Sequence, residues 1–454
     1  MTVCAAEPAM ADEDGRTPQA GCAITFDGCY AARLARSGGS LFPERWTLDG
    51  PEPYAVPLPG NQPEEPGTEV QPMGDGRVLI RRLTDGRHTF SLLYPTGPDT
   101  GELPLGAVEC PDEGTRLRLL PPAPGGATAY ALAVGRRSSA VWQVAGGAFG
   151  PEHLAEVPGR CSGGVWLDGT GRMLALDREI GGRTKTVVVD LERAGEVSPL
   201  LQIAADSDDR LLLADPDSGL LLIRSDAPSP GRERLGWGVL GSTLPVRFPE
   251  CLRVDGCTVT PFAIQPGQIL APESCAVALR IDAPLGGWIG VWRPAARQIQ
   301  HLRAPEGWLA GAGRWTEDEV LHLPYATAEA PCGLARVYAP SGETGDRGET
   351  GETAETVETG GTGGAGAAGG TAWARTVGAR AVGARAVGFG AAGAGGPVGG
   401  GPEEPVEGGG TAVRTGSGGY FPEWGEPSPP EPPAPVAPRP VPLQQAPLGR
   451  LVTN

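Results

Sequence analysis

The sequence predicts an all-β fold built from a repeated unit of four short strands. Short β-type apolar runs recur along residues 21–340, and Asp-Gly or Gly-Gly pairs separate many of them. Such pairs favour the tight turns of β-hairpins, because both turn positions need residues that accept positive φ. The unit recurs roughly every 40 to 60 residues, and no stretch shows the 3.6-residue apolar periodicity of an amphipathic helix.

The clearest copy of the unit begins at Cys161. Its four strands are expected at residues 165–167, 173–176, 186–191 and 194–204. An Asp-Gly pair separates the first two strands, and Gly181-Gly182 separates the second from the third. The stretch 163–191 contains the only lysine of the chain, Lys185, and no histidine, cysteine or serine. It therefore offers no obvious nucleophile and no soft metal ligand.

Six further copies share this order of strands and turns. They begin at Cys22, Gly74, Thr115, Arg210, Cys257 and Gly313. The Asp-Gly pairs begin at Asp27, Asp49, Asp75, Asp85, Asp168 and Asp255. Tryptophan recurs in the expected third strands, at Trp142, Trp237, Trp288 and Trp292, where packing between repeats would bury it. The last copy stops after its third strand, near Tyr338.

With this repeat the chain resembles the β-propeller superfamily over residues 21–340, with a WD40-like or TolB-like architecture. The Gly-His and Trp-Asp signatures of WD40 blades are missing from the sequence, as are Asp-box and kelch patterns, so the resemblance names no subfamily. It implies six or seven four-stranded blades around a central channel. One or two β-sandwich domains of similar strand spacing remain the alternative.

Composition sets the two ends of the chain apart. Residues 1–20 are polar and acidic, and residues 341–438 are rich in Gly, Pro, Glu and Thr. Both segments hold too few apolar side chains to offset the entropy of ordering, so we expect disorder. Apolar residues return in 439–454, at Val441, Leu443 and Leu448. We expect this segment to complete the last blade as its fourth strand, which makes 341–438 a long disordered insertion.

Charge and composition exclude several kinds of partner. The net charge is −17 and the sequence holds no basic stripe, which argues against nucleic acid. No run of about 18 apolar residues predicts a membrane span, and the first 21 residues lack the features of a signal peptide. The nine cysteines are odd in number and form no C-x-x-C pair, which predicts free thiols. We therefore expect a cytoplasmic monomer.

Candidate chemistry in the sequence is sparse. The four histidines, His88, His153, His301 and His322, form no metal-binding pattern, and the sequence has no G-x-S-x-G elbow, P-loop or dinucleotide fingerprint. Acidic residues cluster at 206–209, 215–217 and 317–319. The first two clusters look like Ca²⁺ loops without the downstream Glu, and turns between strands explain them. For 317–319 we expect a solvated strand edge. We predict no catalytic, cofactor or metal residues.

These observations favour a non-enzymatic cytoplasmic β-propeller that binds a protein partner on one face of the disc as a scaffold. The alternative is an enzyme or small-ligand binder. Its site would lie at the mouth of the channel, assembled from Arg, Asp or Glu side chains of several blades.

Overall fold

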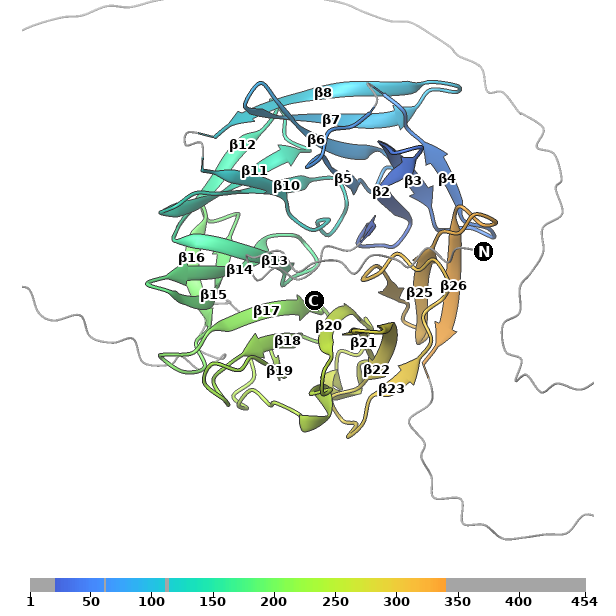
Figure 1. Cartoon of the computed structure of the whole chain (residues 1–454). Coiled ribbons are helices and arrows are strands. Elements are labelled where there is room, and N and C mark those ends of the chain that lie inside the picture. The colour runs from blue at the N-terminus through green and yellow to red at the C-terminus, as the bar shows by residue number, and fades with distance from the viewer. Residues whose placement is uncertain (1–20, 61–62, 111–113, 340–454) are drawn as a thin grey trace, which may run out of the picture. The chain divides into compact units, whose positions relative to one another are not determined.

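The computed structural model describes residues 21–60, 63–110 and 114–339. These residues form seven antiparallel sheets that follow one another along the chain and are arranged in a ring (Figure 1). Five sheets have four strands and two have three. The described part of the chain is thus a seven-bladed β-propeller. The all-β prediction is confirmed, and the β-sandwich alternative is wrong.

Each blade uses consecutive strands. Blades 1 and 2 comprise β1 (Ala23–Ile24), β2 (Tyr30–Ser37), β3 (Ser40–Thr47), β4 (Tyr54–Pro57), β5 (Glu69–Pro72), β6 (Val78–Thr84), β7 (Arg87–Pro95) and β8 (Thr100–Glu109). Blades 3 and 4 comprise β9 (Arg116–Leu119), β10 (Ala129–Val134), β11 (Ser138–Ala145), β12 (Glu152–Pro158), β13 (Arg160–Trp166), β14 (Met173–Ile180), β15 (Arg183–Asp190) and β16 (Glu196–Leu201).

The other three blades follow in the same way. Blade 5 comprises β17 (Asp209–Ala214), β18 (Leu220–Ser225) and β19 (Arg234–Val239). Blades 6 and 7 comprise β20 (Thr258–Ile264), β21 (Val277–Ala283), β22 (Gly286–Trp292), β23 (Gln300–Leu302), β24 (Arg314–Trp315), β25 (Val320–Tyr325) and β26 (Gly333–Tyr338). The helices of the described residues are two short 3-10 turns, Glu250–Leu252 and Pro272–Ser274.

Two-residue turns join the second and third strands of several blades, as the sequence predicts. The pairs Gly38–Gly39, Asp85–Gly86 and Gly181–Gly182 have positive φ at both positions, and the flanking residues pair directly across the turn. This is the type I′ geometry that matches the twist of a hairpin. Asp255-Gly256 is an exception, since it lies in the link before β20 and joins no hairpin. Blade 2 also begins earlier than predicted, at Glu69.

The hydrophobic core of the ring lies between the blades. The buried apolar residues form seven clusters, and each cluster draws its members from two neighbouring blades. The cluster between blades 5 and 6 contains Trp237 and Trp292, as predicted for third-strand tryptophans. Trp142 and Trp288 are only partly buried. Because every sheet is covered on both faces by its neighbours, no blade has a core of its own.

Among the described residues, no strand is shared between the first and last blades where the ring closes. Cys22, Trp46 and Ala312 are buried together at this boundary. Arg314 Nε donates a hydrogen bond to the carbonyl oxygen of Phe26 at 3.1 Å, and the Gly21 amide donates to the carbonyl of Ala310 at 3.3 Å. Side-chain packing and a few hydrogen bonds therefore hold blade 7 against blade 1.

Two blades depart from the four-stranded pattern. In blade 5 the fourth position is reduced to a bridge in which Trp237 and Arg247 exchange two backbone hydrogen bonds of 2.9 Å. In blade 7 the third strand ends at Tyr338, as predicted. One of the six residues of β26 is buried, compared with four of six in β19. The strand expected at 439–454, like the disorder expected at 1–20 and 341–438, lies outside the described residues.

No helix long and apolar enough to cross a bilayer occurs among residues 21–60, 63–110 and 114–339.

The exposed outer edge of β26 makes the expected fourth strand testable. Deletion of residues 439–454 should lower the melting temperature by several degrees, because an edge of the last sheet would lose its cover; in a domain of roughly 300 residues, about 1 kcal/mol corresponds to roughly 1.5 °C. Deletion of 345–435 should leave it nearly unchanged, since the entropy of loop closure grows slowly with length. Differential scanning calorimetry measures both. Equal melting temperatures for the full chain and the 439–454 deletion would refute the assignment.

Candidate functional site

The three acidic segments found in the sequence lie in three separate loops. Residues 206–208 precede β17, 215–219 join β17 to β18, and 317–319 join β24 to β25. The expected strand edge at 317–319 is therefore wrong, and the segment is an exposed turn. At 215–219, Asp215 Oδ2 accepts hydrogen bonds from the amide and the hydroxyl of Ser218, at 2.8 and 2.6 Å. This carboxylate stabilises its own turn.

Asp209 is completely buried and fully hydrogen-bonded. Its Oδ1 accepts hydrogen bonds from the hydroxyls of Ser207 and Ser225, at 2.9 and 2.6 Å. Its Oδ2 accepts from Lys185 Nζ at 2.7 Å and from the amide of Ile203 at 2.9 Å. A carboxylate offers roughly four acceptor positions, and all are occupied here. Asp209 therefore has no lone pair left for a metal ion.

Lys185 ties blade 4 to blade 5. Its ammonium group, on β15, donates hydrogen bonds to Asp209, to Ser207 Oγ at 3.0 Å and to the carbonyl of Ala204. Three tetrahedral donors thus meet three acceptors from the link and the first strand of the next blade, a geometry that suits an ammonium better than a planar guanidinium. The one lysine of the chain has a structural role.

Asp177 is a second buried carboxylate at the boundary of blades 4 and 5. Its Oδ1 accepts hydrogen bonds from the hydroxyl of Thr186 at 2.7 Å and from the amide of Leu211 at 3.0 Å. Burial raises the pKa of Asp177 to about 6, and these hydrogen bonds and the charges of Arg210 and Arg118 oppose that rise. The carboxyl group therefore titrates well above the usual range of an aspartate.

The first strands of the blades hold few groups suited to catalysis at the channel. Within the described residues they carry two acidic side chains, Glu69 and Asp209, and no histidine. Glu69 Oε2 accepts a hydrogen bond from the amide of Leu119 at 2.6 Å, and Arg118 donates to the carbonyl of Gly163. Each of these hydrogen bonds joins one blade to the next. These charged groups of the first strands therefore hold neighbouring blades together.

The four histidines lie in four different blades. His88 Nδ1 lies 3.0 Å from Arg81 Nη1, and burial lowers the pKa of His88. Trp288 Nε1 donates a hydrogen bond of 2.7 Å to His301. His153 is exposed, and burial lowers the pKa of His322. In the part of the chain that the structure describes, no group of three or more His, Cys, Asp or Glu residues is arranged to hold a metal ion.

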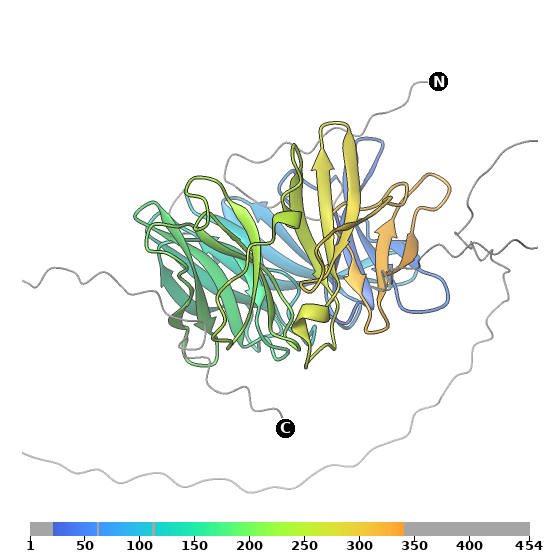
Figure 2. The same cartoon turned by 90° about the horizontal axis from the view of Figure 1, so that it is seen from below.

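The two ends of the disc differ in their apolar surface. At one end of the disc, turns join the first strand of each blade to the second and the third strand to the fourth. We call this end the first-turn end. The turns between second and third strands and the links between blades lie at the opposite end, the link end. Figure 2 shows the disc with turns at both ends.

Exposed large apolar side chains gather at the first-turn end. Of twelve such side chains among the described residues, nine lie in its turns or in the strand halves next to them, and three belong to the link end. The nine are Phe26, Tyr54, Tyr94, Leu103, Phe149, Leu244, Ile269, Leu270 and Tyr338. The three are Leu83, Ile180 and Leu285. Contiguous apolar patches mark interaction sites, whereas single exposed apolar side chains are common.

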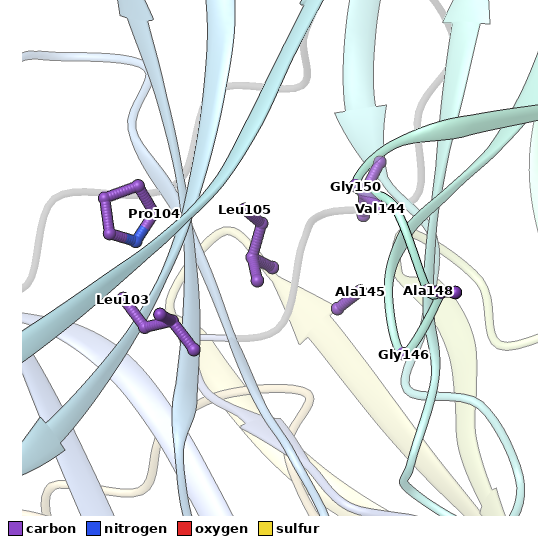
Figure 3. Close-up of a pocket in the computed structure, with 9 residues that line it drawn as sticks. Leu103, Pro104, Leu105, Val144, Ala145, Gly146, Ala148 and Gly150 are labelled. Carbon is purple, nitrogen blue, oxygen red and sulfur yellow. The ribbon is translucent and has the colours of Figure 1, made fainter. Parts of the chain in front are cut away.

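A groove of about 210 Å³ lies at the first-turn end, between blades 2 and 3 (Figure 3). Residues 103–105 of β8 form one wall, and the turn 146–150 forms the other. Val144 and Ala145, which are buried in the cluster between the two blades, form its floor. Phe149, at the tip of the turn, is fully exposed. The groove is a recess of mixed polar and apolar lining next to the exposed ring of Phe149.

Sequence reasoning missed this groove, although a local signal exists. Phe149 stands in the stretch Gly-Gly-Ala-Phe-Gly at 146–150, which has no other side chain larger than a methyl group. An aromatic residue in such a turn has little to pack against and is expected to be exposed. Nothing in the sequence indicates that residues 103–105 face this turn, because 41 or more positions separate the two walls.

The raised pKa of Asp177 predicts a pH-dependent stability. The protonated form is favoured in the folded state, so the wild-type protein should lose stability as the pH rises from about 4 to about 6. Asp177→Asn keeps an acceptor for Thr186 and Leu211 and removes the buried charge. As the pH rises from about 4 to about 6, the free energy of unfolding of this variant should increase by up to about 3 kcal/mol relative to that of wild type. Urea unfolding at several pH values measures the gain, and Asp255→Asn, an exposed position, is the control. A difference that does not change with pH would contradict the assignment.

Comparison with known proteins shows only remote similarity. No protein-family model matches the sequence, and no curated protein matches it. Oligogalacturonate lyase from Vibrio parahaemolyticus is 12% identical, with 70% of this chain and 89% of that chain covered and a TM-score of 0.45. TolB from Acinetobacter baumannii is 10% identical, with 67% of this chain and 78% of that chain covered and a TM-score of 0.36. Prolyl oligopeptidase B from Galerina marginata is 12% identical, with 71% of this chain and 49% of that chain covered and a TM-score of 0.43. The seven sheets themselves establish that the chain is a β-propeller.

Proposed function

We propose that this β-propeller is a non-enzymatic binding module that holds a protein partner at its first-turn end. The observation that carries the proposal is the distribution of exposed apolar side chains, nine of twelve at that end. Phe149 and Leu270 are 102% and 97% exposed, so they contribute nothing to the core and cost solubility. Aromatic and large aliphatic anchors of this kind dominate the energy of protein interfaces.

The alternative, a site for catalysis or a small ligand at the channel mouth, has weaker support. Such a site needs several convergent carboxylates or histidines with free lone pairs. The two acidic side chains of the described first strands, Glu69 and Asp209, are engaged with neighbouring blades.

A cytoplasmic location remains part of the proposal. It is supported by the eight cysteines of the described residues, which are all unpaired. Burial raises the pKa of Cys22 and of Cys332 to about 12, which keeps these thiols protonated and unreactive in the folded state. Unpaired, buried thiols suit a reducing compartment.

The binding face can be tested with matched double variants. Phe149→Asp with Leu270→Asp adds two charges at the first-turn end, and Leu83→Asp with Leu285→Asp adds the same charges at exposed positions of the link end. We expect the first pair to lose most co-purifying proteins from a native lysate, measured by quantitative mass spectrometry, and the second pair to retain them. The reverse pattern would show that the link end is the binding face. Equal melting temperatures of the two variants serve as the control for folding.

The thiol state tests the location. In denaturant without reductant, all nine cysteines of protein purified from its native source should react with a thiol reagent, because a reducing compartment keeps them free. Fewer than about seven reactive thiols would reveal disulfides and contradict a cytoplasmic location.

A further inference from the structure

We propose that the link end of blade 5 carries a phosphate-binding site formed by Arg210 and Arg224. The site goes beyond the proposed function, because the link end lies opposite the first-turn end and the two sites share no residue. It also differs from a site assembled at the channel mouth from several blades, since its charged groups all come from blade 5.

Arg210 and Arg224 lie directly opposite each other on neighbouring strands. Arg210 is the second residue of β17 and Arg224 the fifth of β18, and the two residues are register partners. Both positions are at the link end, where β17 begins and β18 ends. Like charges directly opposite each other destabilise a sheet. The pair therefore costs stability unless an anion balances its two charges.

Neutral groups of the adjacent blades hold both guanidinium groups. Arg210 donates hydrogen bonds to the hydroxyls of Ser162 and Thr184 in blade 4, at 3.3 and 3.2 Å. Arg224 donates one to the carbonyl oxygen of Val259 in blade 6, at 3.3 Å. In the part of the chain that the structure describes, these three bonds are all that the pair makes with about ten N–H donors. Most of the donors are therefore left for a ligand.

The charges of the pair are poorly balanced. Among the described residues, one carboxylate lies within 4.0 Å of either guanidinium, that of Glu233, and it is 3.9 Å from the Nε atom of each. That distance is too long for a hydrogen bond. Arg33 and Arg82 are about as buried, and each has a carboxylate oxygen at 2.7 or 2.8 Å. Burial and the charge of Arg210 lower the pKa of Arg224, although Glu233 opposes this change.

Other carboxylates of this region are engaged elsewhere. Asp209 pairs with Lys185, and Asp226 accepts hydrogen bonds from two backbone amides, at 2.8 and 3.1 Å. Glu233 itself ends the loop 226–233 and is 48% exposed, so its side chain is free to turn into solvent. The side chains of the two arginines are 26% and 19% exposed, which leaves them within reach of a ligand.

A phosphate group suits this pair better than a singly charged anion. A phosphate monoester carries a charge of about −1.5 to −2 at pH 7 and three acceptor oxygens, so it matches two positive charges. The planar fork of a guanidinium binds two phosphate oxygens at once. The carboxylate of Glu233 marks the position, because it is equally distant from the two Nε atoms. A bound phosphate would take the place of that carboxylate.

Titration with inorganic phosphate tests the site on the full chain, with phosphorus NMR as the measurement. Arg224→Met removes one charge and one hydrogen bond, and it should weaken phosphate binding at least about tenfold. The matched control is Arg137→Met, which makes the same change at an exposed position in the link-end turn between β10 and β11 and should bind as wild type does. No binding by wild type, or equal affinities of wild type and Arg224→Met, would overturn the proposal.

A variant with the opposite expected effect separates binding from folding. Glu233→Gln keeps the size of the side chain and removes the charge that competes with phosphate, so it should bind phosphate several-fold more tightly than wild type. A folding defect does not tighten binding. Arg224→Met should melt no lower than wild type, because the repulsion between the two arginines is gone. Equal or weaker phosphate binding by Glu233→Gln would place the phosphate elsewhere and refute the site.

Two further ligands identify the source of the phosphate. Glycerol 3-phosphate represents small phosphate esters, and a short peptide with one phosphoserine represents phosphorylated proteins. The ligand that binds more tightly, and that loses affinity in Arg224→Met, names the source. Glycerol and the unphosphorylated peptide should not bind. If either binds as tightly as its phosphorylated form, the pair does not recognise phosphate and the inference fails.

Discussion

Burial of apolar side chains between neighbouring blades is the interaction on which the rest of this structure depends. Seven clusters occupy the seven boundaries, and each draws from two sheets. A single four-stranded sheet has two faces to cover and cannot do so alone. Each blade is therefore stable only when its neighbours are folded, and the ring folds as a unit. The boundary between blades 7 and 1 is the one that no covalent link along the described chain supports.

Polar groups strengthen the same boundaries. Lys185 and the buried Asp209 form an ion pair of 2.7 Å that joins blade 4 to blade 5, and Glu69 joins blade 2 to blade 3. Buried charges are tolerated when their hydrogen-bonding positions are satisfied, as those of Asp209 are. In the described part of the chain, Glu69 and Asp209, the acidic side chains at the starts of first strands, are engaged in these contacts between blades. They are held in fixed positions by partners from the adjacent blade.

The same architecture leaves the turns free for recognition. Some turns of the first-turn end add buried residues such as Leu120 and Met73 to the inter-blade clusters, whereas other turns carry side chains that point to solvent. The groove between blades 2 and 3 shows how this works: its floor belongs to the core, while its walls come from β8 and from a glycine-rich turn. A partner bound there, as we propose, would meet a rigid base, and that rigidity would limit the entropy lost on binding.

The sequence by itself determined the local structure of this protein. The turn pairs at 85–86 and 181–182, the strand order of the seven copies and the end of the last copy near Tyr338 follow from residues within a few positions of one another. The one misread pair, Asp255-Gly256, shows the limit, because an Asp-Gly pair indicates where a turn lies and not what the turn connects. Tertiary structure alone decided that the blades number seven rather than six, that Lys185 meets Asp209, and that residues 103–105 face the turn 146–150. These contacts join separate blades. They depend on how whole sheets pack, which no pattern within one repeat records.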